Sequence, residues 1–261
     1  PAMTDTASHA TEGAGERESL LLLPGLLNDS DLWAQQIADL RGIADIRVAD
    51  TSSHHALPEL ARAILADAPA RFSLAGLSMG GYAAFEILRQ APERVTRLAL
   101  VNTSARPDTD AAMSRRRGLI ELAQKGEFKG VTPRLLPSLL SERHLANEAL
   151  TQRVYAMAER VGRDGFIRQQ HTIMSRPDSR PLLPGIAVPT LVIGGREDTL
   201  TPPEIAEEMA AAIPGADLLV LSGAGHLSPL ERPHAVSRAL RGWLARTWTP
   251  DQPSKIGPAP S

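Results

Sequence analysis

The sequence predicts an α/β protein with a doubly wound, mostly parallel sheet of about six strands and a helical cap insertion. Between residues 19 and 247, short apolar runs alternate with segments of helical periodicity. The run at Phe72–Ala75 is continuously apolar, which is typical of a strand buried on both faces. One connection, residues 104–185, is much longer than a single crossover helix requires. These observations favour a core built from residues 19–103 and 186–247.

The core elements follow one another in a regular order. The predicted strands are SLLLLPG, DIRVAD, FSLAG, RVTRLALVN, PTLVIGG and ADLLVLS. The predicted helices are NDSDLWAQQIADL, LPELARAILADA, MGGYAAFEILRQ, PPEIAEEMAAAI and PHAVSRALRGWLART. We expect Ser30 to be the N-cap of the first helix. Strands that alternate with helices in this way form parallel sheets with helices on both faces.

The connection at 104–185 contains three helical patterns, MSRRRGLIELAQKG, ALTQRVYAMAERVG and GFIRQQHTIMSR, and no convincing strand. We therefore expect a helical cap above the C-terminal edge of the sheet, where open parallel sheets bind their ligands. Residues 1–18 form a polar leader without the basic and apolar regions of a signal peptide. We expect this leader and the proline-rich tail at 248–261 to be disordered.

Composition excludes several classes of function. A net charge of -2 gives no indication of a nucleic-acid partner. No apolar run approaches the roughly 18 to 20 residues that span a bilayer. The absence of cysteine excludes disulfides, thiolate metal sites and a cysteine nucleophile. A cytoplasmic enzyme acting on a small molecule is the default interpretation, and the composition does not define an oligomeric state.

Gly76, Ser78 and Gly80 form a G-x-S-x-G pattern at a junction between a predicted strand and a predicted helix. In a nucleophile elbow, this turn holds the serine in a strained conformation and exposes its hydroxyl group. Small neighbours are needed because the strand and helix backbones pass very close there. The pattern predicts Ser78 as a nucleophile, and a glycine-rich turn with an incidental serine is the alternative.

A serine nucleophile needs a general base, and His226 is the best candidate. It lies in a loop of small residues directly after the last predicted strand, on the edge where Ser78 would project. His54 and His55 could be mistaken for a metal pair, but adjacent side chains diverge and no third ligand is evident. His171 could face substrate, although a helix-surface position is the commoner outcome. The remaining histidines are His9, His144 and His234.

The acid that orients the base should also follow a strand. The loop VIGGREDTLTPPE offers Glu197 and Asp198, and we prefer Asp198 because it lies one step further into the loop. A turn before Pro202 is the structural alternative for both carboxylates. Ser78, Asp198 and His226 then occur in the serine–acid–histidine order of a known hydrolase arrangement.

The motifs LLPGLLND, GLSMGG, APERVTRLALVNTSARP, GREDTLTPP and GAGHLSPLERP resemble those of the α/β-hydrolase superfamily, in the branch of small bacterial lidded esterases and enol-lactonases. The resemblance covers about residues 19–247. It implies an oxyanion hole formed by the N–H groups of Leu26 and Met79, with no metal and no organic cofactor. Pro24-Gly25 stands where the family usually has His-Gly, and the family's N-terminal hairpin is expected to be missing.

The resemblance implies hydrolysis of a carboxylic ester or lactone through an acyl-enzyme on Ser78. The alternatives are a carbon–carbon bond hydrolase or thioesterase with the same residues and, more remotely, a non-catalytic binding protein. The cap is expected to act as a lid whose removal leaves Ser78 reactive. Arg115–Arg117 are interpreted as a solvated helix face rather than a site for acidic substrates. Apolar cap residues that could line a pocket or form the cap's own core are Leu135, Leu136, Leu139, Leu140, Met157 and Phe166.

Overall fold

The computed structural model describes residues 17–246 and contains a six-stranded, entirely parallel sheet with the strand order β2-β1-β3-β4-β5-β6. The strands are β1 (Glu18–Leu23), β2 (Ala44–Val48), β3 (Phe72–Leu77), β4 (Val95–Val101), β5 (Thr190–Gly195) and β6 (Asp217–Leu221). This confirms the predicted fold class. The segments predicted to be disordered lie almost wholly outside the described residues. The first strand in the described part of the chain is β1.

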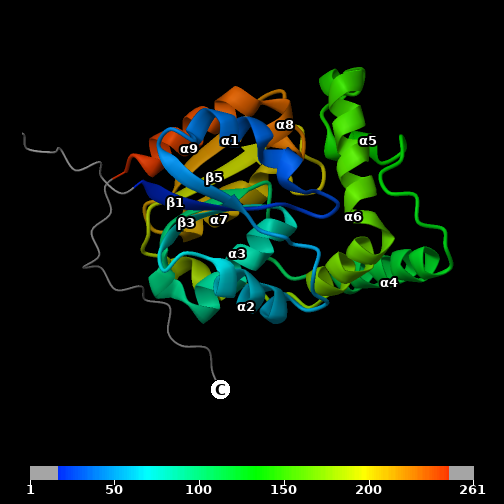
Figure 1. Cartoon of the computed structure of the whole chain (residues 1–261), viewed down its shortest axis with the longest axis horizontal. Coiled ribbons are helices and arrows are strands. Elements are labelled where there is room, and N and C mark those ends of the chain that lie inside the picture. Colours follow the sequence, from blue (N-terminus) through cyan, green and yellow to red (C-terminus); the bar gives the residue numbers. More distant parts are fainter. Residues whose placement is uncertain (1–16, 247–261) are drawn as a thin grey trace, which may run out of the picture.

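Helices cover both faces of the sheet. The α-helices are α1 (Ala34–Leu40), α2 (Leu57–Asp67), α3 (Met79–Gln90), α4 (Asp110–Gln124), α5 (Leu136–Leu139), α6 (Glu148–Met174), α7 (Pro203–Ala212), α8 (Ser228–Glu231) and α9 (Pro233–Leu244). Helices α1, α8 and α9 lie on one face, and α2, α3 and α7 lie on the other (Figure 1). The two large apolar clusters match these faces, one with α2 and α3 residues and one with α1 and α9 residues. No helix in the described part of the chain is long and apolar enough to cross a membrane.

The sheet has a topological switch point between β1 and β3. The chain passes from β1 to β2 on one side and then returns to place β3 on the other side of β1. Connections from β1 and β3 therefore leave the C-terminal edge in opposite directions and open a crevice between them. The segment after β1 begins with Pro24, and the segment after β3 begins with Ser78. Both predicted elements of the site flank this crevice.

One local detail differs from the prediction, and one is confirmed. Asp29, not Ser30, caps the first helical segment, because its side chain accepts the N–H of Asp31 and a short 3-10 turn precedes α1. The second and third predicted cap helices are the two halves of α6, which a non-helical backbone conformation at Gly162 separates. Gly162 has φ 68°, a left-handed conformation that glycine adopts without steric cost.

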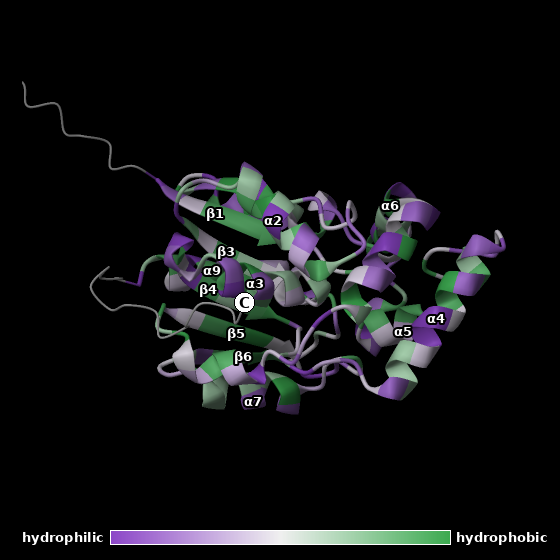
Figure 2. Cartoon of the chain, turned by 90° about the horizontal axis from the view of Figure 1, so that it is seen from below, coloured by the Kyte–Doolittle hydropathy of each residue, from purple (hydrophilic) through white to green (hydrophobic). Residues whose placement is uncertain are grey.

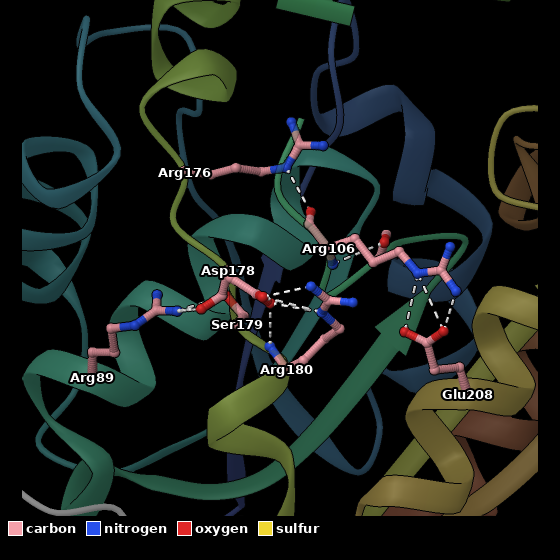
Figure 3. A network of polar contacts seen from close by, with 8 residues as sticks. Arg89, Arg106, Arg176, Asp178, Ser179, Arg180 and Glu208 are labelled. Atoms are coloured by element: carbon pink, nitrogen blue, oxygen red, sulfur yellow. Dashed lines mark hydrogen bonds and ion pairs between the residues drawn. The ribbon is translucent and has the colours of Figure 1, made fainter. Parts of the chain in front are cut away.

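The segment between β4 and β5 contains α4, α5 and α6 and extends past one end of the strands (Figure 2). Polar contacts join its two connections to the core (Figure 3). Ser179 donates its N–H to the Ala105 carbonyl at 2.8 Å, and Arg176 Nε donates to the Arg106 carbonyl at 3.1 Å. Arg106 also forms an ion pair with Glu208 of α7. The outgoing and returning connections are thus bonded to each other.

Candidate active site

Ser78 occupies the turn between β3 and α3 with φ 54° and ψ -114°. A left-handed conformation is strained for serine, and two hydrogen bonds hold it here. Its N–H donates to the Val101 carbonyl at 3.0 Å, and its carbonyl accepts the Thr103 hydroxyl at 2.7 Å. A Cβ atom on Gly80 would lie 2.2 Å from the Leu23 carbonyl oxygen, so only glycine fits. The local geometry is that of a nucleophile elbow.

His226 lies between Ser78 and Asp198. Its Nε2 atom is 2.9 Å from Ser78 Oγ, and its Nδ1 atom is 2.8 Å from Asp198 Oδ2. The histidine and the aspartate are 5% and 3% exposed, while Ser78 is only partly buried. The structure therefore brings together the three residues predicted from the sequence. The connectivity lets Nδ1 donate to the carboxylate while Nε2 accepts from the hydroxyl.

The Asp198 carboxylate is fully engaged. Its Oδ1 atom accepts the N–H groups of Leu200 and Thr201, and its Oδ2 atom accepts Thr201 Oγ1 and Asn102 Nδ2. Burial raises the pKa of this carboxyl, but the nearby His226 and these hydrogen bonds outweigh burial and hold the pKa below its ordinary value. Asp198 is therefore an anion beside the imidazole.

The sequence predicted no role for Asn102 and offered Glu197 only as the alternative acid. Asn102 follows β4, bridges Asp198 and the Gly225 carbonyl, and accepts the Ser228 hydroxyl at 2.5 Å. Glu197, the alternative acid, does not contact His226. It accepts the N–H groups of Gly223 and Ala224 at 3.1 and 2.9 Å. Its position just after β5 was the available signal, and its contacts brace the loop that carries His226.

The segment after β1 carries Leu26, one of the two residues whose N–H groups are expected to form the oxyanion hole. Asn28 donates its N–H to the Gly25 carbonyl, which closes a turn around Leu26. Leu27 adopts φ 58° and donates its N–H to Gln169 Oε1 of α6 at 3.0 Å, inside the protein. Leu26 lines the cavity that contains Ser78. Met79 is the first residue of α3, so its N–H has no intrahelical acceptor.

The other histidines lie elsewhere. His54 pairs with Ser53, and the rings of His55 and His171 lie 5.6 Å apart. His144 contacts Glu231 at 3.0 Å, and His9 lies outside the described residues. Within residues 17–246, no group of three or more potential ligands could hold a metal ion. The His54–His55 pair therefore has no third ligand in the described chain.

A cavity of about 890 Å³ lies between the sheet edge and the cap and reaches Ser78 and His226. Of the six apolar cap residues considered, Leu135, Leu139 and Phe166 line it. The other three pack with sheet and helix residues in the core, namely Leu136, Leu140 and Met157. The interpretation of Arg115–Arg117 as a purely solvated face is wrong in part. Arg115 and Arg116 line the cavity, and Arg116 is partly buried.

The cap contacts both loops of the site. The carbonyl of Leu139, at the end of α5, accepts the N–H groups of His226 and Leu227 at 3.0 and 3.1 Å. Gln169 of α6 holds the Leu27 N–H on the opposite loop. These bonds connect the cap to both loops, and the expectation that Ser78 still reacts without the cap stays a prediction. The same segment that covers the cavity also positions the residues below it.

A nucleophile elbow at the switch point of a parallel sheet is the arrangement of hydrolytic α/β enzymes. The model of the alpha/beta hydrolase family matches residues 20–239, so the chain belongs to this family and is an enzyme of it. A pimeloyl-(acyl-carrier protein) methyl ester esterase from Vibrio parahaemolyticus is 27% identical, over 81% of this chain and 88% of that protein.

Two solved structures are similar over most of their length. A thermophilic esterase from Thermogutta terrifontis has a TM-score of 0.79 and 29% identity, and the match covers 88% of this chain and 90% of that one. The enol-lactonase from Burkholderia xenovorans LB400 has a TM-score of 0.80 and 27% identity, over 90% of this chain and 94% of that one. Both proteins share the fold of this chain.

Proposed function

We propose that the protein is a serine hydrolase that cleaves the carboxylic ester or lactone bond of a small to medium-sized molecule. The observation that carries this proposal is the hydrogen-bonded chain from Ser78 Oγ through His226 to Asp198 Oδ2. Relatives named as an ester esterase and an enol-lactonase support the choice of bond. A cavity of this size accommodates a molecule of that class.

The first half of the reaction forms an acyl-enzyme. His226 Nε2 takes the proton of the Ser78 hydroxyl as Oγ attacks the carbonyl carbon. The Leu26 and Met79 N–H groups stabilise the oxyanion, and each such donor lowers the activation barrier by about 3 to 4 kcal/mol in comparable sites. His226 then gives its proton to the departing alkoxide, so that the alcohol or the opened lactone hydroxyl leaves neutral.

The second half hydrolyses the acyl-enzyme. His226 accepts a proton from water, the hydroxide attacks the acyl carbon, and Ser78 regains its proton as the acid is released. Asp198 fixes the tautomer of His226 and stabilises the imidazolium in both halves. These residues perform each step without a metal or an organic cofactor.

The cap, residues 104–185, is proposed to select the substrate. Thioesters and activated carbon–carbon bonds are alternatives, because the same three residues attack their carbonyl groups. A non-catalytic binding role is disfavoured because it gives no reason to keep the nucleophile, base and acid within hydrogen-bond distance. The cytoplasmic location stays a prediction.

Replacement of Ser78 tests the proposal. Ser78→Ala should fold normally, lose p-nitrophenyl ester hydrolysis by several orders of magnitude and resist labelling by an organophosphonate. Ser138→Ala is the matched control, because Ser138 lines the same cavity and, within residues 17–246, its hydroxyl bonds only to the Leu135 carbonyl. A Ser78→Ala variant with more than a tenth of the normal turnover would contradict the assignment. A parallel panel of lactones, thioesters and acyl-CoA then ranks the bond types.

A further inference from the structure

Two guanidinium groups meet one carboxylate in the wall of the cavity. Arg116 Nε lies 2.7 Å from Asp108 Oδ2, and Arg176 Nη2 lies 2.8 Å from Asp108 Oδ1. The side chains of Asp108 and Arg176 are 4% and 9% exposed, and that of Arg116 is 20% exposed. These three side chains, two guanidinium groups and one carboxylate, carry one positive charge in excess, and they are largely shielded from solvent. A buried charge of this kind is costly unless a partner is supplied.

The cluster also offers hydrogen-bond donors without acceptors. Arg116 Nη1 donates to Gln170 Oε1 at 2.8 Å, which turns the amide group of Gln170 so that Nε2 is left over. Gln170 is 1% exposed and lines the cavity. Among the described residues, neither Gln170 Nε2 nor Arg116 Nη2 has an acceptor. Two donors, one of them charged, therefore remain available on two side chains that are hydrogen-bonded to each other in the cavity wall.

The donors belong to the same cavity as the nucleophile. Tyr82 is one turn after Ser78 on α3, and its N–H bonds to the Ser78 carbonyl. The Arg176 guanidinium lies 4.2 Å from the centroid of the Tyr82 ring. Arg176 also donates to the carbonyl groups of Arg106 (Figure 3) and Ile173, so its role is to hold the cap base and Asp108. Arg116, by contrast, keeps most of its donors free.

The cavity as a whole favours an anion. Its described lining contains five cationic side chains and two carboxylates. The cationic residues are Arg106, Arg115, Arg116, Lys129 and Arg176, and the carboxylates are Asp108 and Glu127. Asp108 is paired with two guanidinium groups, and Arg106 is paired with Glu208 of α7. Glu127, Arg115 and Lys129 are all exposed. An acidic group on a substrate would be attracted toward Arg116 rather than repelled.

We propose that Arg116 and Gln170, the Arg116–Gln170 pair, bind a carboxylate carried by the substrate at a distance from the bond that is cleaved. The preferred substrates are then half-esters of dicarboxylic acids, or lactones that bear a carboxylate. Guanidinium and carboxamide N–H groups side by side match the two oxygens of a carboxylate. This inference rests on the proposed function, and it names the substrate class of that site.

Two matched substrate series test it. One series contains p-nitrophenyl half-esters of dicarboxylic acids of graded length, and the other contains p-nitrophenyl alkanoates of the same lengths. The wild-type enzyme should prefer the half-ester at one length by about tenfold or more in kcat/KM. Arg116→Met should lower kcat/KM for that half-ester by about 10- to 100-fold and leave the matched alkanoate within about threefold. Asp108 keeps Arg176 as its partner in this variant.

Arg117→Met is the control, because Arg117 is the next residue of α4, is exposed and does not line the cavity. Arg117→Met should leave kcat/KM unchanged for both the half-esters and the alkanoates. Gln170→Glu provides a second variant with almost unchanged volume. Its carboxylate would occupy Arg116 internally, so it should abolish the preference for half-esters while alkanoate hydrolysis persists.

Three results would overturn the inference: no half-ester preferred by the wild type, equal loss of both series in Arg116→Met, or an unchanged preference in Gln170→Glu. If Arg116→Met does not fold, Gln170→Glu decides the question. Failure of the proposed function is separate, because it appears as absent alkanoate hydrolysis and absent labelling of Ser78 by a phosphonate.

Discussion

Asp198 and Glu197 are adjacent carboxylates that contact the same loop in different ways. Asp198 Oδ2 lies 2.8 Å from His226 Nδ1, whereas Glu197 accepts two backbone N–H groups at Gly223 and Ala224. Asp198→Asn should leave substrate binding nearly intact and lower kcat by about 10⁴-fold, the loss seen when a comparable triad receives the wrong imidazole tautomer. Steady-state kinetics measures both parameters.

Glu197→Gln is the matched variant. Glutamine has one acceptor oxygen for two N–H groups, so it should lower the free energy of unfolding by about 1 to 3 kcal/mol and reduce kcat far less than Asp198→Asn. The reverse ranking of the two variants in kcat would assign the acid to Glu197.

The Asp198 carboxylate also links folding to pH. Its pKa is lower in the folded protein than its ordinary value of 3.8, because His226, Asn102 and Thr201 outweigh the effect of burial. The unfolded chain therefore binds the proton more readily, and the stabilisation from Asp198 is present above pH 3.8. It should be lost as the pH falls through the folded pKa.

Urea unfolding of the wild type and Asp198→Asn between pH 6 and pH 3 measures this effect. The difference in free energy of unfolding between the two proteins should be constant at the higher pH values of this range. It should decrease as the pH falls below 3.8. A difference that stays the same down to pH 3 would contradict the lowered pKa.

At the scale of elements, the cap helix α6 supports the loop after β1. Gln169 is fully buried, and its Oε1 atom holds the Leu27 N–H next to the proposed donor Leu26. Gln169→Leu would leave that N–H buried and unpaired, which costs about 1 to 3 kcal/mol. Because the adjacent turn loosens, kcat should fall by about tenfold or more while KM changes little.

Thr172→Val is the control for Gln169→Leu. Thr172 lies on the same helix, is equally buried, and bonds to the His54 carbonyl after β2 rather than to the loop after β1. Both variants should lose comparable stability in urea unfolding. Equal losses of kcat in the two would show that α6 acts only through general packing.

The sequence predicted the regular elements well, because apolar runs and helical periodicity report burial directly. It also placed Ser78, Asp198 and His226 after strands whose C-terminal ends share one edge. Contacts between segments that are far apart in the chain leave no such pattern in the sequence. Gln169 reaches Leu27 across 142 positions, and Arg116 reaches Gln170 across 54. A polar residue on a helix looks solvated until the fold shows what lies opposite.

At the scale of the whole molecule, the cap and the catalytic loops form one hydrogen-bonded unit. The N–H groups of Leu27, His226 and Leu227 all donate to acceptors on the cap. The Ser78 N–H, in contrast, donates to Val101 within the core. Opening of the cap would therefore release the first three amides together and leave the fourth protected.

Amide hydrogen exchange of the intact protein tests this coupling. If the cap moves as one body, the opening free energies of the Leu27, His226 and Leu227 amides should agree with one another and lie below that of Ser78. A covalent phosphonate on Ser78 that also touches the cap should slow all three together, because it would tie the cap to the core. Three unrelated exchange rates would mean that each loop opens by itself. The cap would then cover the site without controlling its geometry, and a catalytic site could persist beneath an altered lid.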